Sequence, residues 1–349
     1  LTLQQQAAVL QRNRDGGKVA AIRLTTASVP DTPTGVPTWA YYAAGGLGGL
    51  LLGVALAFLR HRLDRRAQST REVEFALGTR VIGAIPPFNW RFRRGTWALL
   101  MGHDKGGAAL GSAREAYRRL RSSVSFLART TESNVVVFTS SKPLEGKSTT
   151  SANLAVTIAR GGSTVALVSA DLRRPSLERL FGIAPRRGLT DFLTGATETV
   201  QTEILPDIPN LVLIPAGAPL DNPGELFGGD RFRRLVQKLR SEFDLVIIDT
   251  PPLKVAADAA AAAHHSNGVI VVVDGNRTES PELVAIRREL DRAGVELLGA
   301  VMNRDRSQRV GRLGRGRYGY YVDKRNRRAP SIADEFADDL PAGGLVLDD

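Results

Sequence analysis

Short runs of apolar residues alternate with longer segments of helical periodicity over residues 110–305 of the chain. Residues 149–160 and 281–292 place apolar side chains every three to four positions, which is typical of helices packed on a core. Strands buried on both faces read as continuous Val, Ile and Leu runs separated by helices. The pattern predicts an α/β domain over residues 110–305 with a doubly wound, mostly parallel sheet, whose strands contain Val135–Phe138, Val165–Ser169, Leu211–Ile214, Leu245–Ile248, Val269–Val273 and Leu298–Met302.

A different pattern lies near the start, where no charged residue occurs between Asp31 and Arg60. Residues 39–59 are mostly apolar or small, and at about 1.5 Å per residue they reach roughly 30 Å, the thickness of a bilayer's hydrocarbon core. Aromatic residues lie at the N-terminal end of this run and arginines follow its C-terminal end, which places the following chain in the cytoplasm. We predict a single transmembrane helix over 39–59; a buried helix of a soluble protein is the alternative.

The segments around these two units have less regular patterns. Residues 1–38 are expected to be extracytoplasmic, with a helix over 1–14, a strand over 17–29 and a Pro-rich linker. Residues 60–109 are Arg-rich and are expected to be a juxtamembrane linker. The last segment, 306–349, is expected to be a flexible tail that is first basic and then acidic. The chain begins with Leu rather than Met, which indicates that it is part of a longer protein.

Charge and composition exclude several classes of function. The formal net charge is +11 over 349 residues, and residues 60–94 and 304–328 together carry more than this excess. A nucleic-acid-binding domain carries its basic face on the folded core, which here has a small negative balance, so no nucleic acid partner is expected. The chain has no cysteine, which excludes disulfides, Cys-ligated metals and thiol nucleophiles, and its four histidines have no spacing suited to a metal site.

The strongest chemical motif is SKPLEGKST, which directly follows the first strand of the predicted domain. It fits the pattern GxxxxGK[ST], except that Ser141 replaces the first glycine. In such a loop the backbone N–H groups surround phosphates, the lysine reaches the β- and γ-phosphates, and the hydroxyl binds Mg²⁺. The N-terminus of the following helix favours anions as well. The sequence therefore predicts a site for ATP and Mg²⁺ that contains Ser141, Lys142, Glu145, Gly146, Lys147, Ser148 and Thr149.

Two carboxylates follow other predicted strands. Asp249 ends the strand sequence LVIID, and Asp171 comes just after the strand VALVS. The carboxyl ends of parallel strands meet at the sheet edge where the P-loop lies, so we expect both carboxylates close to Lys147 and Ser148. Either aspartate alone would also fit a turn or a helix cap. We predict that Lys147, Asp171 and Asp249 are catalytic and that Ser148 and the two aspartates hold Mg²⁺.

These motifs together resemble those of the bacterial tyrosine autokinases of the polysaccharide co-polymerase family, which control capsule and exopolysaccharide synthesis. SSKPLEGKST is similar to the Walker A motif of the family, VSADLRRP to its Walker A′ motif and VIIDTPP to its Walker B motif. The resemblance covers almost all of residues 15–325 and implies a MinD/ParA-like P-loop kinase domain attached to the bacterial inner membrane. It also implies a phosphate contact for Lys142 across a dimer and an adenine contact for Asn303; a solvated loop lysine and a turn asparagine are the alternatives.

The resemblance further implies an assembly and a phosphate acceptor. The helix sequence EAYRRLR is similar to the family's ExxRxxR element, which mediates ring assembly, and places Glu115, Arg118 and Arg121 in it; a solvated helix face is the alternative. Tyr318, Tyr320 and Tyr321 resemble the C-terminal tyrosines that neighbouring subunits phosphorylate, although the basic tail would also suit anionic lipid. The partners implied are a homo-oligomeric ring, the polysaccharide polymerase and export machinery, and a tyrosine phosphatase.

The chain departs from the family at Ser169, where the Walker A′ motif usually has its first acid. That acid is associated with accepting the tyrosine proton, so we expect slow phosphorylation. The tyrosine cluster is short, and the extracytoplasmic chain-length domain is nearly absent. The expected function is a membrane-anchored protein-tyrosine autokinase that regulates exopolysaccharide polymerisation and export. The alternative is a MinD/ParA-like membrane ATPase or scaffold without tyrosine kinase activity.

Overall fold

The computed structural model of the chain describes residues 6–8, 11, 36–63, 66–88, 108–130, 134–184, 187–253 and 258–305. Two compact units divide the chain, Leu1–Asp64 and Arg65–Asp349. Of the predicted helix over 1–14, the described residues 6–8 and 11 are helical, whereas the predicted strand over 17–29 and the tail over 306–349 lie outside the described residues.

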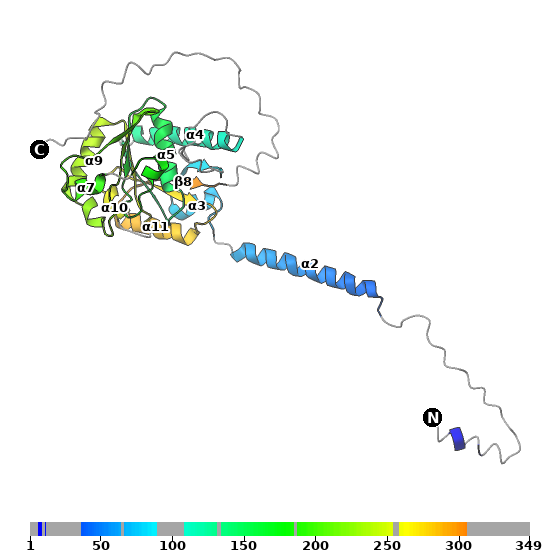
Figure 1. The fold of residues 1–349 in the computed structure, drawn as a ribbon. Helices are drawn as coiled ribbons and strands as arrows, with labels where there is room; N and C mark the ends of the chain where they lie inside the picture. The colour runs from blue at the N-terminus through cyan, green and yellow to red at the C-terminus, as the bar shows by residue number, and fades with distance from the viewer. Residues whose placement is uncertain are drawn as a thin grey trace, which may run out of the picture. The chain divides into compact units, whose positions relative to one another are not determined.

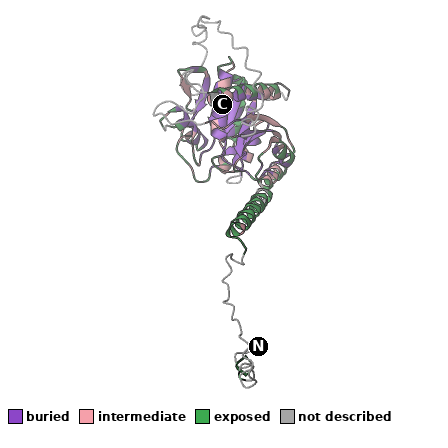
Figure 2. Ribbon diagram, turned by 90° about the vertical axis from the view of Figure 1, so that its right-hand side faces the viewer, coloured by how far each residue is buried: buried purple, intermediate pink, exposed green. Residues whose placement is uncertain are grey.

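Helix α2 (Thr38–Leu63) is the main described element of the first unit and contains the predicted membrane helix over 39–59. Its apolar side chains face outwards, and Leu50 and Phe58 are 64% and 63% exposed. By length and composition, residues 38–60 are long and apolar enough to cross a membrane. Figure 2 shows that α2 is exposed, in contrast to the buried core of the second unit.

The second unit is built on one sheet of eight strands in the order β1-β8-β7-β2-β6-β3-β5-β4. Every neighbouring pair is parallel except β4 and β5, which run antiparallel. The doubly wound, mostly parallel fold predicted from the sequence is thus confirmed. The strands are β1 (Val81–Ile85), β2 (Val135–Ser140), β3 (Val165–Ser169), β4 (Glu203–Leu205), β5 (Ile208–Ile214), β6 (Leu245–Asp249), β7 (Val269–Asp274) and β8 (Leu297–Asn303).

Helices cover both faces of this sheet (Figure 1). One face carries α4 (Ala108–Thr130), α5 (Lys147–Ala159) and α6 (Leu177–Phe181). The opposite face carries α3 (Thr70–Leu77), α7 (Leu189–Leu193), α8 (Gly224–Phe227), α9 (Asp230–Glu242), α10 (Asp258–Ala263) and α11 (Ser280–Arg292).

The core forms because successive side chains of a strand point to opposite faces, and both faces are covered. Val136 and Phe138 pack into the α4–α5–α6 layer, whereas Val135 and Val137 pack into the opposite layer. All four are at most 2% exposed. Burying each such side chain contributes about 1.5–3 kcal/mol, which explains why this strand reads as a continuous apolar run.

The expected linker over 60–109 is wrong for residues 66–88, because α3 and β1 are parts of the domain. Strand β1 pairs with β8 at one edge of the sheet, and α3 packs on α11. The strand was missed because it is short and only half-buried, with the sequence VIGAI in an Arg-rich region. Its Gly83 lets α4 approach closely, since a Cβ there would lie 2.8 Å from Leu120 Cδ1. The three-residue strand β4 was missed for the same reason of length.

Candidate functional site

The P-loop, residues 141–148, connects the end of β2 to the start of α5 at the carboxyl edge of the sheet. Two of its residues have left-handed backbone, Leu144 with φ 68° and Gly146 with φ 94°. Gly146 is required for space as well, because a Cβ there would lie 2.1 Å from Asn303 Nδ2. The left-handed region costs a non-glycine residue about 1–2 kcal/mol, so contacts elsewhere must hold Leu144 in place.

Three charged side chains meet at this edge and are called the P-loop charge cluster: Lys147, Asp171 and Asp249. Lys147 Nζ lies 2.9 Å from Asp171 Oδ2 and 3.7 Å from Asp249 Oδ2. Its ammonium also lies 3.2 Å from Ser148 Oγ. The carboxylates come together because β6 lies between β2 and β3, so both follow strands beside the P-loop. All three side chains have at most about a tenth of their surface exposed.

Burial decides the protonation of this cluster. Loss of water raises the pKa of Asp249 to about 6, although Lys147 acts in the opposite direction. The same burial by itself lowers the pKa of Lys147, but the two carboxylates outweigh it and leave the lysine pKa above its usual value. The lysine is therefore a cation at neutral pH, with two carboxyl groups beside it.

The oxygen atoms at this edge fit Mg²⁺. Asp249 Oδ1 is buried and has no hydrogen-bond partner, and neither has Ser141 Oγ. An unpaired buried carboxylate oxygen is costly unless a cation or a hydrogen-bond donor supplies the missing interaction. Among the described residues no group of three or more His, Cys, Asp or Glu side chains forms a metal cage. Mg²⁺ binds one or two carboxylates together with substrate phosphates and water, and the two carboxylates at this edge fit that kind of site.

A second set of hydrogen bonds and ion pairs stabilises the P-loop. Glu145 is 1% exposed; its Oε2 accepts a hydrogen bond from Lys142 N at 2.9 Å, and its Oε1 accepts one from Thr278 Oγ1. Asn303 Nδ2 donates to Glu145 O at 2.8 Å, and Arg304 pairs with Asp274 beside the loop. Burial raises the pKa of Glu145. These bonds fix the backbone of the loop between Lys142 and Gly146.

The structure gives Lys142 and Asn303 specific partners within the chain. Lys142 Nζ forms an ion pair of 2.7 Å with Glu282 of α11, and its side chain is 38% exposed. Its predicted phosphate contact across a dimer stays a prediction, as does the alternative of a solvated loop lysine. The amide of Asn303 uses both ends, because Nδ2 bonds Glu145 and Oδ1 accepts from Arg304 N. Its predicted adenine contact stays a prediction, and the structure adds a role in holding Gly146.

Ser169 ends β3 and lies opposite Asp249 in the register of β3 and β6. The hydroxyl-bearing residue is 1% exposed. The position where the family usually has an acid is therefore inside the sheet edge and next to the P-loop charge cluster.

The predicted assembly residues of α4 differ in their contacts. Glu115 and Arg118 are exposed and form an ion pair of 3.5 Å within the helix. Arg121 instead leans on the end of α5, where a Cβ on Gly161 would lie 2.3 Å from Arg121 Nη1. This arginine links α4 to the helix that begins with Lys147.

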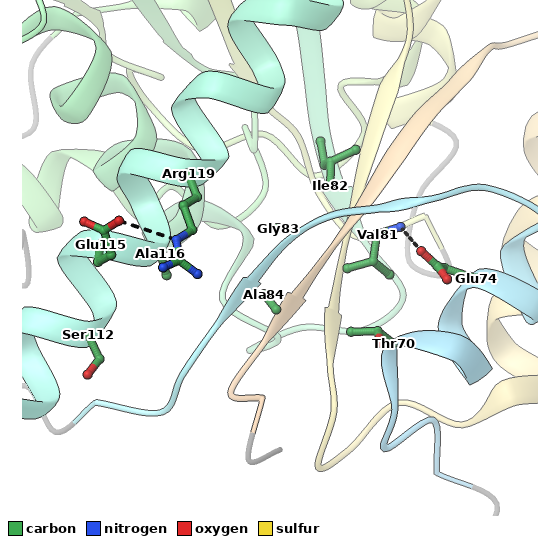
Figure 3. Close-up of a pocket in the computed structure, with 10 residues that line it drawn as sticks. All are labelled: Thr70, Glu74, Val81, Ile82, Gly83, Ala84, Ser112, Glu115, Ala116 and Arg119. Atoms are coloured by element: carbon green, nitrogen blue, oxygen red, sulfur yellow. Dashed lines mark hydrogen bonds and ion pairs between the residues drawn. The ribbon is translucent and has the colours of Figure 1, made fainter. Parts of the chain in front are cut away.

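A groove lies between α4, β1 and the start of α3 (Figure 3). Glu115 and Arg119 line it from α4, Thr70 and Glu74 from α3, and Gly83 lies at its base. Glu74 accepts a hydrogen bond from Val81 N at 2.9 Å, which closes one end of the strand edge. The groove contains none of the P-loop residues, so it is separate from the predicted nucleotide site, and its lining includes Glu115 of the predicted assembly element.

The predicted acceptors Tyr318, Tyr320 and Tyr321 lie outside the described residues. Another tyrosine of the second unit, Tyr117 of α4, is 1% exposed and packs in the core between α4 and the sheet. Burial also raises its pKa far above the usual value of a phenol. Tyr117 is therefore a core residue, and phosphorylation there would require α4 to leave the domain.

Sequence reasoning missed residues that position the site from distant loops. Arg173 in the sequence ADLRRP donates to Asp258 Oδ2 at 2.9 Å and ties the loop of Asp171 to α10. Thr278 was missed as well, because a threonine in a loop has no distinguishing sequence pattern. The Arg173 signal was present in the Walker A′ match, but its buried partner was visible only in the fold.

Residues 133–284 match the protein family described as AAA domain. The chain is 33% identical over 317 residues to the putative tyrosine-protein kinase EpsB of Ralstonia nicotianae. This match covers 87% of this chain and 42% of EpsB. The chain thus spans less than half the length of that relative. It is 32% identical over 212 residues to the tyrosine-protein kinase YwqD of Bacillus subtilis, which covers 61% of this chain and 87% of YwqD.

Among solved structures, the kinase domain of the Escherichia coli tyrosine kinase ETK superposes on this chain with a TM-score of 0.59. The two sequences are 29% identical, and the match covers 66% of this chain and 92% of the ETK domain. The matched part is large enough to contain the sheet, the P-loop and both aspartates.

Proposed function

The chain belongs to the family of bacterial tyrosine-protein kinases, and we propose that it transfers the γ-phosphoryl group of ATP to tyrosine hydroxyls of neighbouring copies. The observation that carries this proposal is the P-loop charge cluster. Lys147 is a buried cation held between Asp171 and Asp249. It is the first residue of α5, and the N-terminus of a helix favours phosphate. This combination suits the binding of a nucleoside triphosphate better than acid–base catalysis on a neutral substrate.

Each residue of the site has a separate task in the proposed mechanism. The N–H groups of the P-loop bind the phosphates, and Lys147 neutralises charge on the β- and γ-phosphates. Asp171 orients the lysine, while Ser148, Asp171 and Asp249 would hold Mg²⁺. When bound, Mg²⁺ supplies further charge neutralisation on the phosphates. Ser169 leaves the site without a second Walker A′ carboxylate to accept the tyrosine proton, so positioning and charge neutralisation supply most of the rate.

The proposed acceptors are Tyr318, Tyr320 and Tyr321 in the tail that follows β8. Glu115, Arg118 and Arg121 mediate ring assembly, which brings the tail of one copy to the P-loop of the next. Support for this arrangement comes from the exposure of Glu115 and Arg118, which keeps their charges available to another copy.

We further propose a location in the bacterial inner membrane with the kinase domain and the C-terminus in the cytoplasm. The apolar, exposed helix α2 supports membrane attachment, and the arginines after it support the orientation. Phosphorylation and release of the ring would regulate the exopolysaccharide polymerase and export machinery, and a tyrosine phosphatase would reset the cycle.

Anti-phosphotyrosine blotting of the purified full chain, with and without ATP and Mg²⁺, tests this function. The chain has six tyrosines, which allows two complementary variants. Replacing Tyr318, Tyr320 and Tyr321 by Phe should remove the signal and leave ATP binding unchanged. The complementary variant, with Tyr41, Tyr42 and Tyr117 replaced by Phe, should keep the signal. A full signal from the first variant would contradict the proposed acceptors.

Ser169 favours a second candidate function, a membrane-attached ATPase or assembly scaffold without tyrosine kinase activity. For this candidate function we expect ATP hydrolysis and ATP-dependent assembly, but no phosphotyrosine at any enzyme concentration. Phosphate release measured beside the blot distinguishes the two functions in one experiment.

A further inference from the structure

Leu144 of the P-loop combines two features that are uncommon in one residue, a left-handed backbone and an exposed apolar side chain. Its φ is 68°, and the residue is 76% exposed. Among the described residues, Arg304 is the other non-glycine residue with a positive φ. Backbone strain of this kind persists where the surrounding structure fixes it, and it is concentrated at functional sites.

The local sequence explains where the strain comes from. Pro143 and Leu144 form a turn, and Lys142 N donates to Glu145 Oε2 at 2.9 Å across it. The residue with positive φ that follows a turn proline is usually glycine, because glycine adopts this backbone without strain. Leucine is strained in the same place, and what it adds to the loop is an apolar side chain.

Bonds on both sides hold Leu144 in this conformation. Its carbonyl accepts a hydrogen bond of 3.5 Å from Arg304 Nη1, and Arg304 forms an ion pair with the fully buried Asp274. The next residue, Glu145, accepts a hydrogen bond of 2.8 Å at its carbonyl from Asn303. Because the backbone is fixed on both sides, a partner of the leucine side chain meets a group that is already in position.

Exposed apolar side chains are few on the second unit. Its large hydrophobic residues that are exposed, among those the structure describes, are Phe75, Phe126 and Leu144. Of these three, Leu144 lies in the P-loop, next to the P-loop charge cluster. Charged groups attract phosphate, but an acceptor with an aromatic ring has a large apolar surface that they do not suit.

The chain itself supplies aromatic groups for this place. The described part of the domain ends at Asp305, directly after the arginine that bonds Leu144. Tyr318 follows 13 positions later. An extended chain of that length spans at most about 45 Å, so tyrosines of the tail can reach a P-loop without a further segment.

We propose that Leu144 is the apolar contact for the aromatic ring of the acceptor tyrosine, and that it contributes to acceptor affinity rather than to phosphoryl transfer. The ring packs on the leucine while its hydroxyl faces the phosphates held by Lys147 and the P-loop backbone. The proposal rests on the proposed kinase function, because it identifies a residue that binds the acceptor of that reaction.

Binding of a non-reactive acceptor tests the contact without catalysis. The probe is a fluorescein-labelled peptide with the sequence of residues 312–323, in which Phe replaces all three tyrosines. Its affinity for the full chain is measured by anisotropy with a non-hydrolysable ATP analogue and Mg²⁺. The full chain carries Tyr318→Ser, Tyr320→Ser and Tyr321→Ser, so that its own tail does not compete. In this background Leu144→Gly should weaken peptide binding about fivefold, since it removes the apolar side chain and keeps the left-handed backbone.

Three further variants separate the apolar contact from the backbone. Leu144→Asn tolerates the left-handed region but is polar, so it should weaken binding as the Gly variant does. Leu144→Met keeps an apolar side chain and should stay within about twofold of the parent chain. Phe75→Ser removes an exposed apolar side chain outside the P-loop and should bind the peptide as the parent chain does.

Steady-state kinetics give a second readout, with ATP and the tyrosine form of the same peptide. An interaction made equally in the bound state and in the transition state changes KM and leaves kcat unchanged. Leu144→Gly should therefore raise the KM of the peptide about fivefold and leave kcat and ATP affinity within about twofold. The ATP affinity also checks that the loop of this variant keeps its conformation.

Two results of the binding experiment would overturn this proposal: no difference in peptide affinity between the parent chain and Leu144→Gly, or equal weakening by Leu144→Met and Leu144→Asn. Loss of assembly in Leu144→Gly with unchanged peptide affinity would assign the leucine to a surface between two copies and overturn it as well. A peptide that binds through Leu144 but receives no phosphate supports the contact and contradicts the kinase function. Phosphorylation with a KM independent of Leu144 overturns the contact alone.

Discussion

The P-loop charge cluster and the Glu115–Arg118 pair of α4 have similar geometry but opposite surroundings. Their nitrogen–oxygen distances are 2.9 and 3.7 Å at the P-loop and 3.5 Å on α4. The P-loop side chains are at most 10% exposed, whereas Arg118 and Glu115 are 68% and 50% exposed. In the buried cluster a charge without a partner is costly, so its charged groups stay paired with one another or with a ligand. Water solvates the exposed pair, so its members can exchange partners at little cost.

The contrast explains how one domain holds two kinds of electrostatic interaction. Breaking a buried ion pair costs about 3–5 kcal/mol because the remaining charge has no water to solvate it. An exposed pair contributes only about 0–1 kcal/mol. We therefore expect substitutions at the P-loop to change ligand binding and folding together, and substitutions on α4 to change assembly alone.

Lys147→Met should have the largest effect. It removes the cation of the buried cluster, so ATP affinity should fall at least about a hundredfold and autophosphorylation should be lost. Titration with a fluorescent ATP analogue measures the affinity. Lys238→Met, in the Lys238–Glu242 pair of α9, is the matched control and should bind ATP as wild type does. Retained affinity in Lys147→Met would contradict the assignment of the P-loop.

Asp249→Asn should change how stability depends on pH. Burial raises the pKa of Asp249 to about 6, so its contribution to folding is fully present below the ordinary value near 4 and is lost as pH rises through about 6. The variant lacks this titration. Its unfolding free energy relative to wild type should therefore increase by roughly 1–3 kcal/mol between pH 4 and 7. Denaturant unfolding of the nucleotide-free chain at several pH values checks this, and parallel profiles would exclude it.

Ser169→Asp sharpens the comparison by adding a carboxylate to the buried side. The new group would lie beside Asp249 and supply a base for the tyrosine proton, so phosphotyrosine formation in a single turnover should rise about tenfold. The gain is smaller than for an isolated base, because neighbouring buried carboxylates repel each other and one becomes protonated. ATP affinity should change little.

A wild-type rate equal to or above that of Ser169→Asp would show that the missing acid does not limit the kinase. Ser169→Asn is the control for this prediction. It has nearly the size of the aspartate but no basicity, so it should not accelerate phosphorylation.

Arg118→Glu should have the smallest effect on folding. The exposed pair contributes about 0–1 kcal/mol, so the melting temperature should stay close to that of wild type. Charge reversal places two like charges at the proposed contact between copies, and size-exclusion chromatography should therefore detect monomers. Arg233→Glu, in an exposed pair of α9, is the control and should assemble normally. Unchanged assembly of Arg118→Glu would identify α4 as a merely solvated face.

Much of the fold was predictable because central strands carry a strong local signal. The predicted run Val165–Ser169 has the bounds of β3, and the run from Val135 extends by two residues in β2. Strand β1 was not predictable in the same way, because an edge strand is covered on fewer sides and needs fewer apolar residues. Pairing with β8 and packing of α4 on Gly83, more than local sequence, place it in the sheet.

The approach of Lys147, Asp171 and Asp249 was also predictable, since the carboxyl ends of adjacent parallel strands share one edge. The role of Thr278 was not, because its hydroxyl reaches Glu145 across 133 positions of the chain. Such a bond depends on the position of two loops to within a fraction of an ångström, and no local pattern records that position.

The sequence by itself determined the strand pattern, the P-loop, the apolar helix and the departure at Ser169. All of these depend on residue type and on spacing along the chain, which local propensity and periodicity express. The tertiary structure alone decided which charges are buried, that residues 66–88 are part of the domain, and that Thr278 bonds Glu145 of the P-loop. These features depend on distances between segments far apart in sequence, and the free energy of a charge or hydrogen bond follows from the surroundings that only folding creates.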